Sequence, residues 1–290
     1  MRSNAANYDL IAPPSLEAVL AVLASEPGSY TVLAGGTEIM VALGAGRLSA
    51  RRLISIQHLR ELRFLSASDD TLILGAGTTF TDIRRDAILA SEFPLLVQAA
   101  SWTGSIANQN RGTLGGNIVN GSPAADSPPA LLAYEAELTL LSSRGTRVVP
   151  YTDFHLGYKR TILAPDELLY SIALKRSYQG YKTYSRKVGT RKAQAISKVA
   201  IAALARVEEG RITDVRIGAA SLQDRPARMT ATEQAVLGQA ITADTMQRAR
   251  EAVLAESHPI DDIRSTARYR GQVAANLVEE FLRSLQTDPR

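Results

Sequence analysis

The sequence contains no cysteine among its 290 residues. This absence excludes disulfide bonds, thiol nucleophiles and iron–sulfur clusters held by the chain's own cysteines. The three histidines, His58, His155 and His258, lie far apart in the sequence and lack the spacing of metal ligands. We therefore expect no metal site in this chain.

Long apolar runs are also missing. No stretch approaches the roughly 18 consecutive apolar residues that a membrane-spanning helix requires. The first residues, Met1-Arg2-Ser3-Asn4, lead into no apolar signal segment. These features predict a cytoplasmic, soluble protein with no membrane span.

The charge is nearly balanced, with 33 Lys and Arg against 29 Asp and Glu and a net charge of +4. The cations are spread along the chain, aromatic residues make up only 6%, and no nucleic-acid-binding motif is present. We expect no nucleic-acid partner. The G-x-S-x-G motif of many hydrolases is absent as well.

Glycine-rich nucleotide fingerprints of the usual kinds, G-x-G-x-x-G and the GK[ST] P-loop, do not occur. Two glycine pairs stand out instead. The first lies in Leu33-Ala34-Gly35-Gly36-Thr37-Glu38, and the second in Arg111-Gly112-Thr113-Leu114-Gly115-Gly116-Asn117. A backbone without Cβ atoms can approach a ligand closely and present its N–H groups in a concave nest. Two such loops can hold the two halves of a pyrophosphate.

Two interpretations of the first loop stay open, and both can hold at once. It is a strand-to-helix turn with Thr37 as the N-cap, or it holds a phosphate at the N-terminus of the new helix.

Residues 104–129 are dense in Gly, Asn, Ser and Pro and are expected to form a long loop. Its polar residues are Asn108, Asn110, Asn117, Asn120, Ser122 and Asp126. They indicate either a solvated surface loop or a loop that wraps a polar ligand. A carboxylate repels phosphates, so we expect Asp126 on the ribityl or ribose side of such a ligand.

Hydrophobic periodicity and turn residues predict an α+β protein. We expect helices at 16–24, 81–89 and 94–101 and helical structure from 230 onward, and strands at 30–34, 52–56, 71–77, 137–141, 146–149, 167–174, 181–187, 199–207 and 212–220. A large domain is expected up to residue 176, followed by a smaller one at 177–290 with an antiparallel sheet and helices.

One basic cluster lies just after this boundary and comprises Lys182, Arg186, Lys187, Arg191, Lys192 and Lys198. Most such clusters are solvated faces. Because cofactor sites commonly form between domains, one of these cations can also lie near the negative charge of a reduced cofactor.

Five segments, in order, resemble the FAD-binding medium subunit of molybdenum hydroxylases, the family of the flavoprotein subunits of carbon monoxide dehydrogenase and bacterial xanthine dehydrogenases. They are residues 7–15, 34–38, 110–117 together with 122–126, 191–198 and 260–267. The last two runs most resemble the xanthine dehydrogenase branch.

The resemblance implies a FAD-binding fold of the vanillyl-alcohol-oxidase (PCMH) type, with subdomains at about 1–56 and 57–176, and a C-terminal domain like that of the carbon monoxide dehydrogenase flavoprotein. It implies non-covalent FAD and gives this chain no catalytic acid or base. The implied cofactor-binding residues are Leu33, Ala34, Gly35, Gly36, Thr37, Glu38, Asn110, Thr113, Gly115, Gly116, Asn117, Ser122, Asp126 and Lys187, with Lys187 near the flavin ring.

The resemblance also implies a role in electron transfer within a heterotrimer, which is expected to pair into a dimer of heterotrimers. A small subunit with two [2Fe–2S] clusters would supply electrons, and a large molybdopterin subunit would hydroxylate a purine or another N-heterocycle. The acceptor would be NAD⁺, a quinone, a haem protein or oxygen. The alternatives are a stand-alone FAD oxidase or reductase, such as the type that reduces cell-wall precursors, and a flavin-free assembly module.

Overall fold

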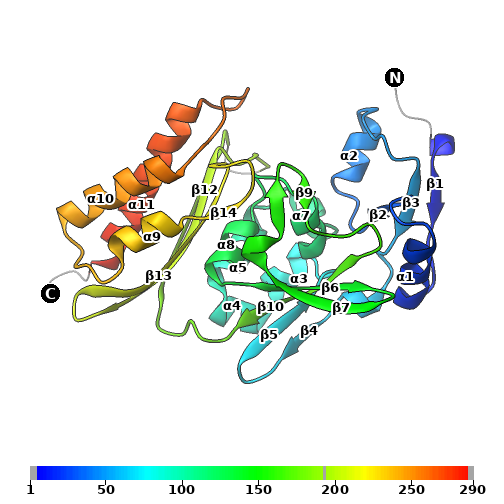
Figure 1. The fold of residues 1–290 in the computed structure, drawn as a ribbon, viewed down its shortest axis with the longest axis horizontal. Helices are drawn as coiled ribbons and strands as arrows, with labels where there is room; N and C mark the ends of the chain where they lie inside the picture. The colour runs from blue at the N-terminus through cyan, green and yellow to red at the C-terminus, as the bar shows by residue number, and fades with distance from the viewer. Residues whose placement is uncertain (1–4, 192–193, 287–290) are drawn as a thin grey trace.

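The computed structural model describes residues 5–191 and 194–286. Lys192 and Ala193 of the basic run and the N-terminal residues Met1–Asn4 lie outside the described residues. Figure 1 shows a small sheet at one end, a larger sheet with helices in the middle, and a second sheet with long helices at the other end. The expected α+β class is confirmed.

The small sheet is parallel and has the order β1-β3-β2. Its strands are β1 (Asp9–Ile11), β3 (Arg52–Ser55) and β2 (Thr31–Leu33), preceded by the 3₁₀ turn η1 (Ala5–Asn7). Helix α1 (Leu16–Ser25) connects β1 to β2 and starts at Ser15, whose side chain accepts a hydrogen bond from Ala18 N. Its apolar face packs against Ile54 of β3 in a separate small core. Helix α2 (Ile39–Gly44) follows β2 and buries none of its residues.

The larger sheet is antiparallel and has the order β4-β5-β10-β6-β7. Its strands are β4 (Leu65–Ala67), β5 (Thr71–Gly75), β10 (Leu168–Lys175), β6 (Glu137–Ser142) and β7 (Gly145–Pro150), of which β6 and β7 form the expected hairpin. The turn η2 (Arg60–Leu62) precedes β4; η3 (Tyr151–Asp153), β8 (His155–Gly157) and β9 (Arg160–Thr161) follow β7.

Helices α3 (Phe80–Arg85), α4 (Ala87–Glu92) and α5 (Pro94–Trp102) contribute to the main core over this sheet. The single helix expected at 81–89 is therefore two helices. Asp86 has an extended backbone that ends α3, and its side chain accepts from Leu89 N to cap α4.

The expected long loop at 104–129 is wrong in part, because this segment contains α6 (Ile106–Gln109), α7 (Leu114–Val119) and the start of α8 (Pro128–Ala133). Ser105 and Thr113 cap α6 and α7. The polar residues that suggested a loop thus serve partly as helix caps, while Leu114 and Ile118 are fully buried.

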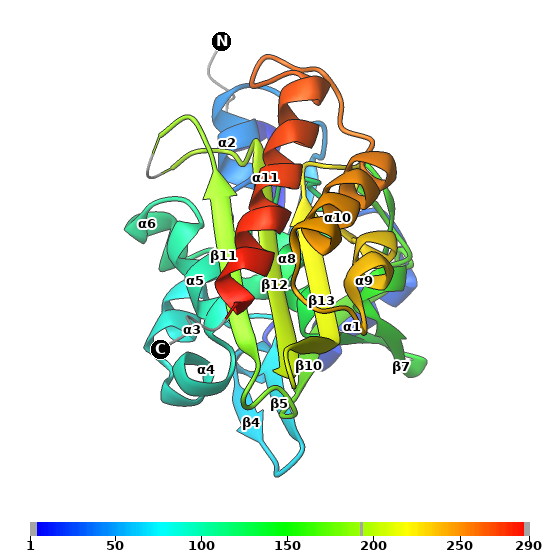
Figure 2. The same cartoon turned by 90° about the vertical axis from the view of Figure 1, so that its left-hand side faces the viewer.

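The C-terminal sheet is antiparallel and runs β11 (Lys182–Val188), β12 (Val199–Glu208), β13 (Arg211–Ala220) and β14 (Ala227–Arg228). Helices α9 (Thr230–Val236), α10 (Ala243–Glu256) and α11 (Ala267–Leu285) cover one face (Figure 2). Alternate side chains of β12 enter two cores: Ile201 and Ala203 face these helices, whereas Ala202 and Leu204 join the main core.

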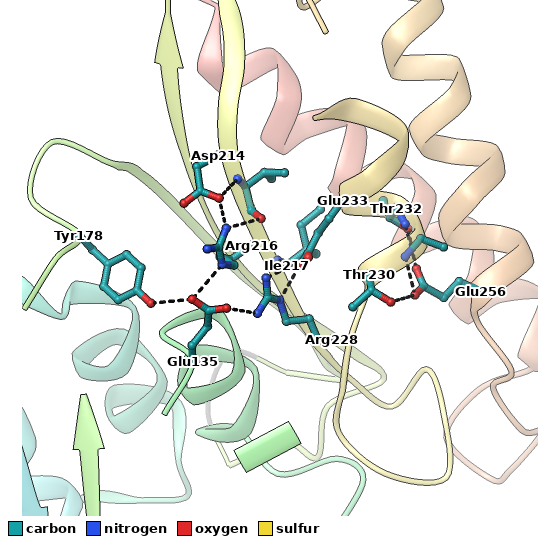
Figure 3. A network of polar contacts seen from close by, with 12 residues as sticks. Glu135, Tyr178, Asp214, Arg216, Ile217, Arg228, Thr230, Thr232, Glu233 and Glu256 are labelled. Carbon is teal, nitrogen blue, oxygen red and sulfur yellow. Dashed lines mark hydrogen bonds and ion pairs between the residues drawn. The ribbon is translucent and has the colours of Figure 1, made fainter. Parts of the chain in front are cut away.

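Helix α8 packs directly on β13 at a glycine. A Cβ on Gly218 would lie 2.1 Å from Pro129 O, so no other residue fits there without moving the backbone. A polar network lies beside this contact (Figure 3). Glu135, just after α8, contacts Arg228 (2.8 Å) and Arg216 (3.1 Å) of the C-terminal sheet, and Arg228 also pairs with Glu233 (2.8 Å). These contacts attach the C-terminal sheet to the main core.

Candidate functional site

The two glycine loops lie against each other. A Cβ on Gly35 would come 1.9 Å from Arg111 O, so the first loop packs on the backbone that leads into the second. Arg111 reinforces the contact by donating to Gly35 O (3.4 Å) and to the Gln57 side chain (2.7 Å). The structure thus brings together two segments that residues 39–110 separate in the sequence.

A third segment, Ala76–Thr79, supports the second loop. Leu114 N donates to Thr78 O and Gly115 N to Ala76 O, both at 2.9 Å. A Cβ on Gly115 would lie 2.6 Å from the Cβ of Ala76. The sequence analysis did not predict this supporting role, although it expected a strand at 71–77 that ends in glycines.

The first loop offers free donors. Within the described chain, the backbone N–H groups of Gly35, Gly36, Thr37 and Glu38 donate to no protein acceptor. Gly36 has a φ of +76°, which turns the backbone and makes successive N–H groups converge. Four such amides on one turn are the donors that an anion-binding nest requires. Thr37 does not act as the N-cap: that position is Glu38, whose side chain makes no capping bond.

The second loop contributes differently. Gly116 N donates to the Thr113 side chain and Asn117 N to Thr113 O, so these amides belong to α7. Gly116 is exposed, and a Cβ there would lie 3.9 Å from the Cβ of Ala34. The second loop therefore provides a surface without side chains that faces the first loop.

Several other predicted site residues also stabilise the local fold. Thr81 donates to Asn110 Oδ1 (2.6 Å), Ser127 to Asn117 Oδ1 (2.6 Å), and Ala124 N to Ser122 Oγ (3.3 Å). Leu33 ends β2, and Ala34 follows it at the start of the first loop. All of these residues lie on the loops or on the segment between α6 and α8.

Asp126 and Lys187 form a buried ion pair between that segment and β11. Lys187 Nζ lies 2.7 Å from Asp126 Oδ2 and also donates to Trp102 O (3.1 Å), while Ser197 Oγ donates to Asp126 Oδ1 (2.8 Å). The two side chains are only 11% and 9% exposed. Burial raises the pKa of Asp126, and the contacts with Lys187 and Ser197 offset this only in part.

Two other cations of the basic cluster, Lys182 and Arg186, contact the C-terminal helix instead. Lys182 donates to Leu285 O (3.1 Å), and Arg186 pairs with Glu280 (2.8 Å), so both contact α11. Lys159, which stands in no motif, lies 3.6 Å from Glu38 and donates its own N–H to Gly121 O. It joins the β8–β9 turn to the first glycine loop and to the residues that follow α7. No sequence motif predicted this contact.

The histidines have structural partners. His155 is buried against Tyr151, whose hydroxyl lies 3.0 Å from Nε2, and burial together with the charge of Arg225 lowers the pKa of His155 to about 4. The part of the chain that the structure describes contains no group of three or more His, Cys, Asp or Glu residues that could hold a metal ion. It also contains no helix long and apolar enough to cross a membrane.

Comparison with known families gives two matches that cover most of the chain. Residues 6–174 match the FAD-binding domain in molybdopterin dehydrogenase, and residues 184–285 match the C-terminal domain of the carbon monoxide dehydrogenase flavoprotein. Among curated relatives, the chain is 31% identical over 265 residues to the xanthine dehydrogenase FAD-binding subunit of Escherichia coli O157:H7, covering 90% of each chain. It is 28% identical over 279 residues to the carbon monoxide dehydrogenase medium chain of Hydrogenophaga pseudoflava, covering 95% and 96%.

Solved structures agree with these matches. The carbon monoxide dehydrogenase of Hydrogenophaga pseudoflava that lacks the Mo-pyranopterin moiety superposes with a TM-score of 0.91 at 28% identity, covering 94% of this chain and 95% of that one. Quinoline 2-oxidoreductase from Pseudomonas putida 86 superposes with a TM-score of 0.89 at 25% identity, covering 98% of each chain. The likeness extends over both the N-terminal and the C-terminal parts.

Proposed function

Because this chain belongs to the FAD-binding medium subunits of molybdenum hydroxylases, we propose that it carries electrons from the [2Fe–2S] clusters of a partner subunit to NAD⁺ or another acceptor. It is an oxidoreductase subunit whose N-terminal part is a FAD-binding domain. The observation that carries the proposal is the contact between the two glycine loops, with four free amides on one of them.

The residues present fit the pyrophosphate of FAD. The nest at Gly35–Glu38 offers N–H donors to a phosphate, and Gly116 leaves the facing surface without a side chain. A carboxylate or a bulky side chain at Gly116 would occupy the same space. We propose that the amides of the first loop bind the phosphates. The second loop leaves space for them, because Gly116 has no side chain.

The remaining predicted residues are proposed to lie along the rest of the cofactor. Asn110, Thr113, Asn117 and Ser122 would border the phosphates and the sugar-like chain. Lys187 would lie near the flavin ring, and Asp126, which is 2.7 Å from it, would lie on the adjoining ribityl side.

FAD, when bound, would supply the redox chemistry between the partner clusters and the acceptor. This chain's residues bind and orient it. The Lys187 cation would stabilise negative charge on the ring, and Asp126 holds the Nζ of Lys187 in place. No acid or base of this chain is assigned a proton-transfer step.

We propose that the partners are an iron–sulfur subunit and a molybdopterin subunit, assembled in the cytoplasm as a dimer of heterotrimers. The substrate is proposed to be a purine or another N-heterocycle, because residues 191–198 and 260–267 resemble the xanthine dehydrogenase branch. The boundary between the two domains is proposed near residue 176, between the two matched segments.

The test is to purify the chain both from its native host, with its partners, and alone. The native material is expected to contain FAD, iron and molybdenum and to oxidise an N-heterocycle. The isolated chain is expected to show a flavin spectrum and NADH-dependent dye reduction without any hydroxylation. Substrate turnover by the isolated chain would indicate a stand-alone enzyme instead, and well-folded protein without flavin absorbance would indicate an assembly module.

A further inference from the structure

Lys159 is a cation that lies next to the first glycine loop, although no motif contains it. Its Nζ is 3.6 Å from Oε1 of Glu38, and the backbone N–H of Glu38 is one of the four free donors of that loop. Within the described chain, Lys159 Nζ donates no hydrogen bond. The N–H donors of its ammonium group are therefore available to a ligand or to water.

The backbone of Lys159 is held in a conformation that a lysine rarely adopts. Its φ of +53° lies in the left-handed region, where Gly, Asn and Asp are the common residues. Its N–H donates to Gly121 O (3.0 Å), and a Cβ added to Gly121 would lie 2.9 Å from the Lys159 Cα. Figure 1 shows β9 beside α7, where this contact occurs. The turn that carries Lys159 is thus fixed on the segment that follows α7.

Glu38 by itself makes the first loop a poor site for a phosphate. Its carboxylate belongs to the residue that directly follows the free amides of Gly35–Thr37, and its side chain is 62% exposed and forms no capping hydrogen bond. A carboxylate and a phosphate repel each other. Among the described residues, Lys159 is the one cation that forms an ion pair with Glu38. A phosphate at this loop therefore requires the charge of Glu38 to be offset, and Lys159 is placed to do so.

Arg111 is a second cation at the loops, but its contacts give it another role. It donates to Gly35 O (3.4 Å) and to the Gln57 side chain (2.7 Å), so it fastens the two loops to each other. Lys159 has no such structural acceptor for its ammonium group.

We propose that Lys159 binds the phosphates of the cofactor together with the amides of the first loop, and that it offsets the charge of Glu38 when no cofactor is bound. This inference rests on the proposed function, because the first loop is the proposed phosphate site. Backbone amides supply only partial positive charge, whereas a lysine supplies a full cation, which is a common partner of phosphate in proteins. The role also accounts for a lysine at a left-handed position that is unfavourable for its backbone.

The experiment titrates the apoprotein of the full chain with FAD and follows the flavin fluorescence, at about 50 mM and about 500 mM salt. Lys159→Asn removes the cation and keeps a residue that tolerates the left-handed turn. Lys159→Arg keeps the charge, and Glu38→Gln removes only the partner of the ion pair. Lys175→Asn is the matched control, because Lys175 is exposed at the end of β10 and forms no ion pair within the described chain.

Lys159→Asn is expected to weaken FAD binding by about tenfold at the lower salt concentration and by less at the higher one, because salt screens exposed charges. Lys159→Arg is expected to restore most of the affinity, and Glu38→Gln to keep or increase it. Unchanged affinity in Lys159→Asn would overturn the proposal. An equal loss in Glu38→Gln or in Lys175→Asn would overturn it as well, because the effect would then come from the ion pair or from the net charge. Failure of the unmodified protein to bind FAD would refute the proposed function itself, which is a separate outcome.

Discussion

Individual glycines in the two loops have different physical roles. At Gly35 and Gly115 the missing Cβ is required by neighbouring protein, because an added carbon would lie 1.9 Å from Arg111 O and 2.6 Å from the Cβ of Ala76. At Gly116 an added carbon would lie 2.9 Å from the Thr113 hydroxyl that caps α7 and 3.9 Å from the Cβ of Ala34, with no backbone atom in the way. Of these three glycines, Gly116 is therefore the one where a side chain disturbs the fold least and faces the first loop.

We predict that Gly116→Val weakens FAD binding at least tenfold, about 1.4 kcal/mol, and also lowers stability, because the new side chain presses on the Thr113 hydroxyl that caps α7. The branched side chain would occupy the space that faces the free amides. Flavin content and the dissociation constant are measured by absorbance and by titration of the apoprotein. Gly44→Val is the control, since Gly44 has nothing within 4 Å of its added Cβ. Wild-type FAD affinity in Gly116→Val would refute the loop assignment.

The Asp126–Lys187 pair illustrates the cost of burying charge. The free-energy cost of taking both charges out of water nearly equals the energy of their attraction. Removing one partner leaves the other as a buried charge without a counter-charge. We predict that Lys187→Met lowers the free energy of unfolding by about 3 kcal/mol and that Asp126→Asn/Lys187→Met recovers most of this loss. Chemical denaturation of all three variants measures the coupling. Additive losses would show that the pair is not coupled.

The same pair predicts a pH dependence. The folded-state pKa of Asp126 is raised, so the fold favours the protonated acid, and this contribution to stability grows as the pH falls through that pKa. In Lys187→Met the pKa should rise further, because the attracting cation is gone. The destabilisation is therefore expected to be smaller at pH 5 than at pH 8, as measured by denaturation at both values. The same destabilisation of Lys187→Met at pH 5 and at pH 8 would contradict this prediction.

At the scale of elements, the site is built from short helices held by caps. Helices α6 and α7 are too short to be stable alone, and Ser105 and Thr113 supply the hydrogen bonds that their first turns need. Leu114 and Ile118 of α7 then dock into the main core, whereas Ile106 of α6 stays exposed. The same logic applies to the α10–α11 turn, where Asp262 binds three groups at once.

Asp262 provides a test of that turn. Its folded-state pKa of about 2 is below the ordinary value of 3.8, so its contribution is complete above that ordinary value and is lost as the pH falls toward 2. We predict that Asp262→Asn lowers the free energy of unfolding by on the order of 1–2 kcal/mol at pH 7. The variant should also lose less stability between pH 4 and 3 than the unmodified protein does. Thermal unfolding across this range measures it, with Asp244→Asn as the exposed control. Equal pH profiles for Asp262→Asn and the unmodified protein would disprove it.

At the scale of the whole molecule, two units share one continuous structure. Strand β12 supplies side chains to both cores, and Gly218 lets α8 contact β13 directly. Glu135 adds a polar clamp beside this apolar contact. Burial raises the pKa of Glu135, but Arg228 and Arg216 outweigh it and leave the pKa below its ordinary value. The clamp is therefore intact at neutral pH and weakens only in acid.

We predict that Glu135→Gln loosens the attachment of the C-terminal unit. Because Glu135 is 38% exposed, the expected loss is only about 1–2 kcal/mol. Limited proteolysis between residues 176 and 182 should become faster, and thermal unfolding should broaden. The control is Glu208→Gln, which removes an exposed pair with a 4.0 Å separation. Unchanged proteolysis in Glu135→Gln would mean that the apolar contact alone joins the units.

The sequence by itself determined the features that depend on local chemistry: the glycine loops, the Ser15 cap, the hairpins at β6–β7 and β12–β13, and the amphipathic α11. It did not reveal α6 and α7, because caps and turns use the same polar residues. Short strands such as β4 and β9 were missed for a similar reason, since pairing with distant partners creates them.

Only the tertiary structure decided how the candidate site is assembled. That the glycine loops touch, that the first keeps four free amides while the second uses its own, and that Lys187 reaches Asp126 all depend on contacts between residues far apart in the sequence. A single sequence records which groups are available. Folding decides which of them bind each other and which remain open to a ligand.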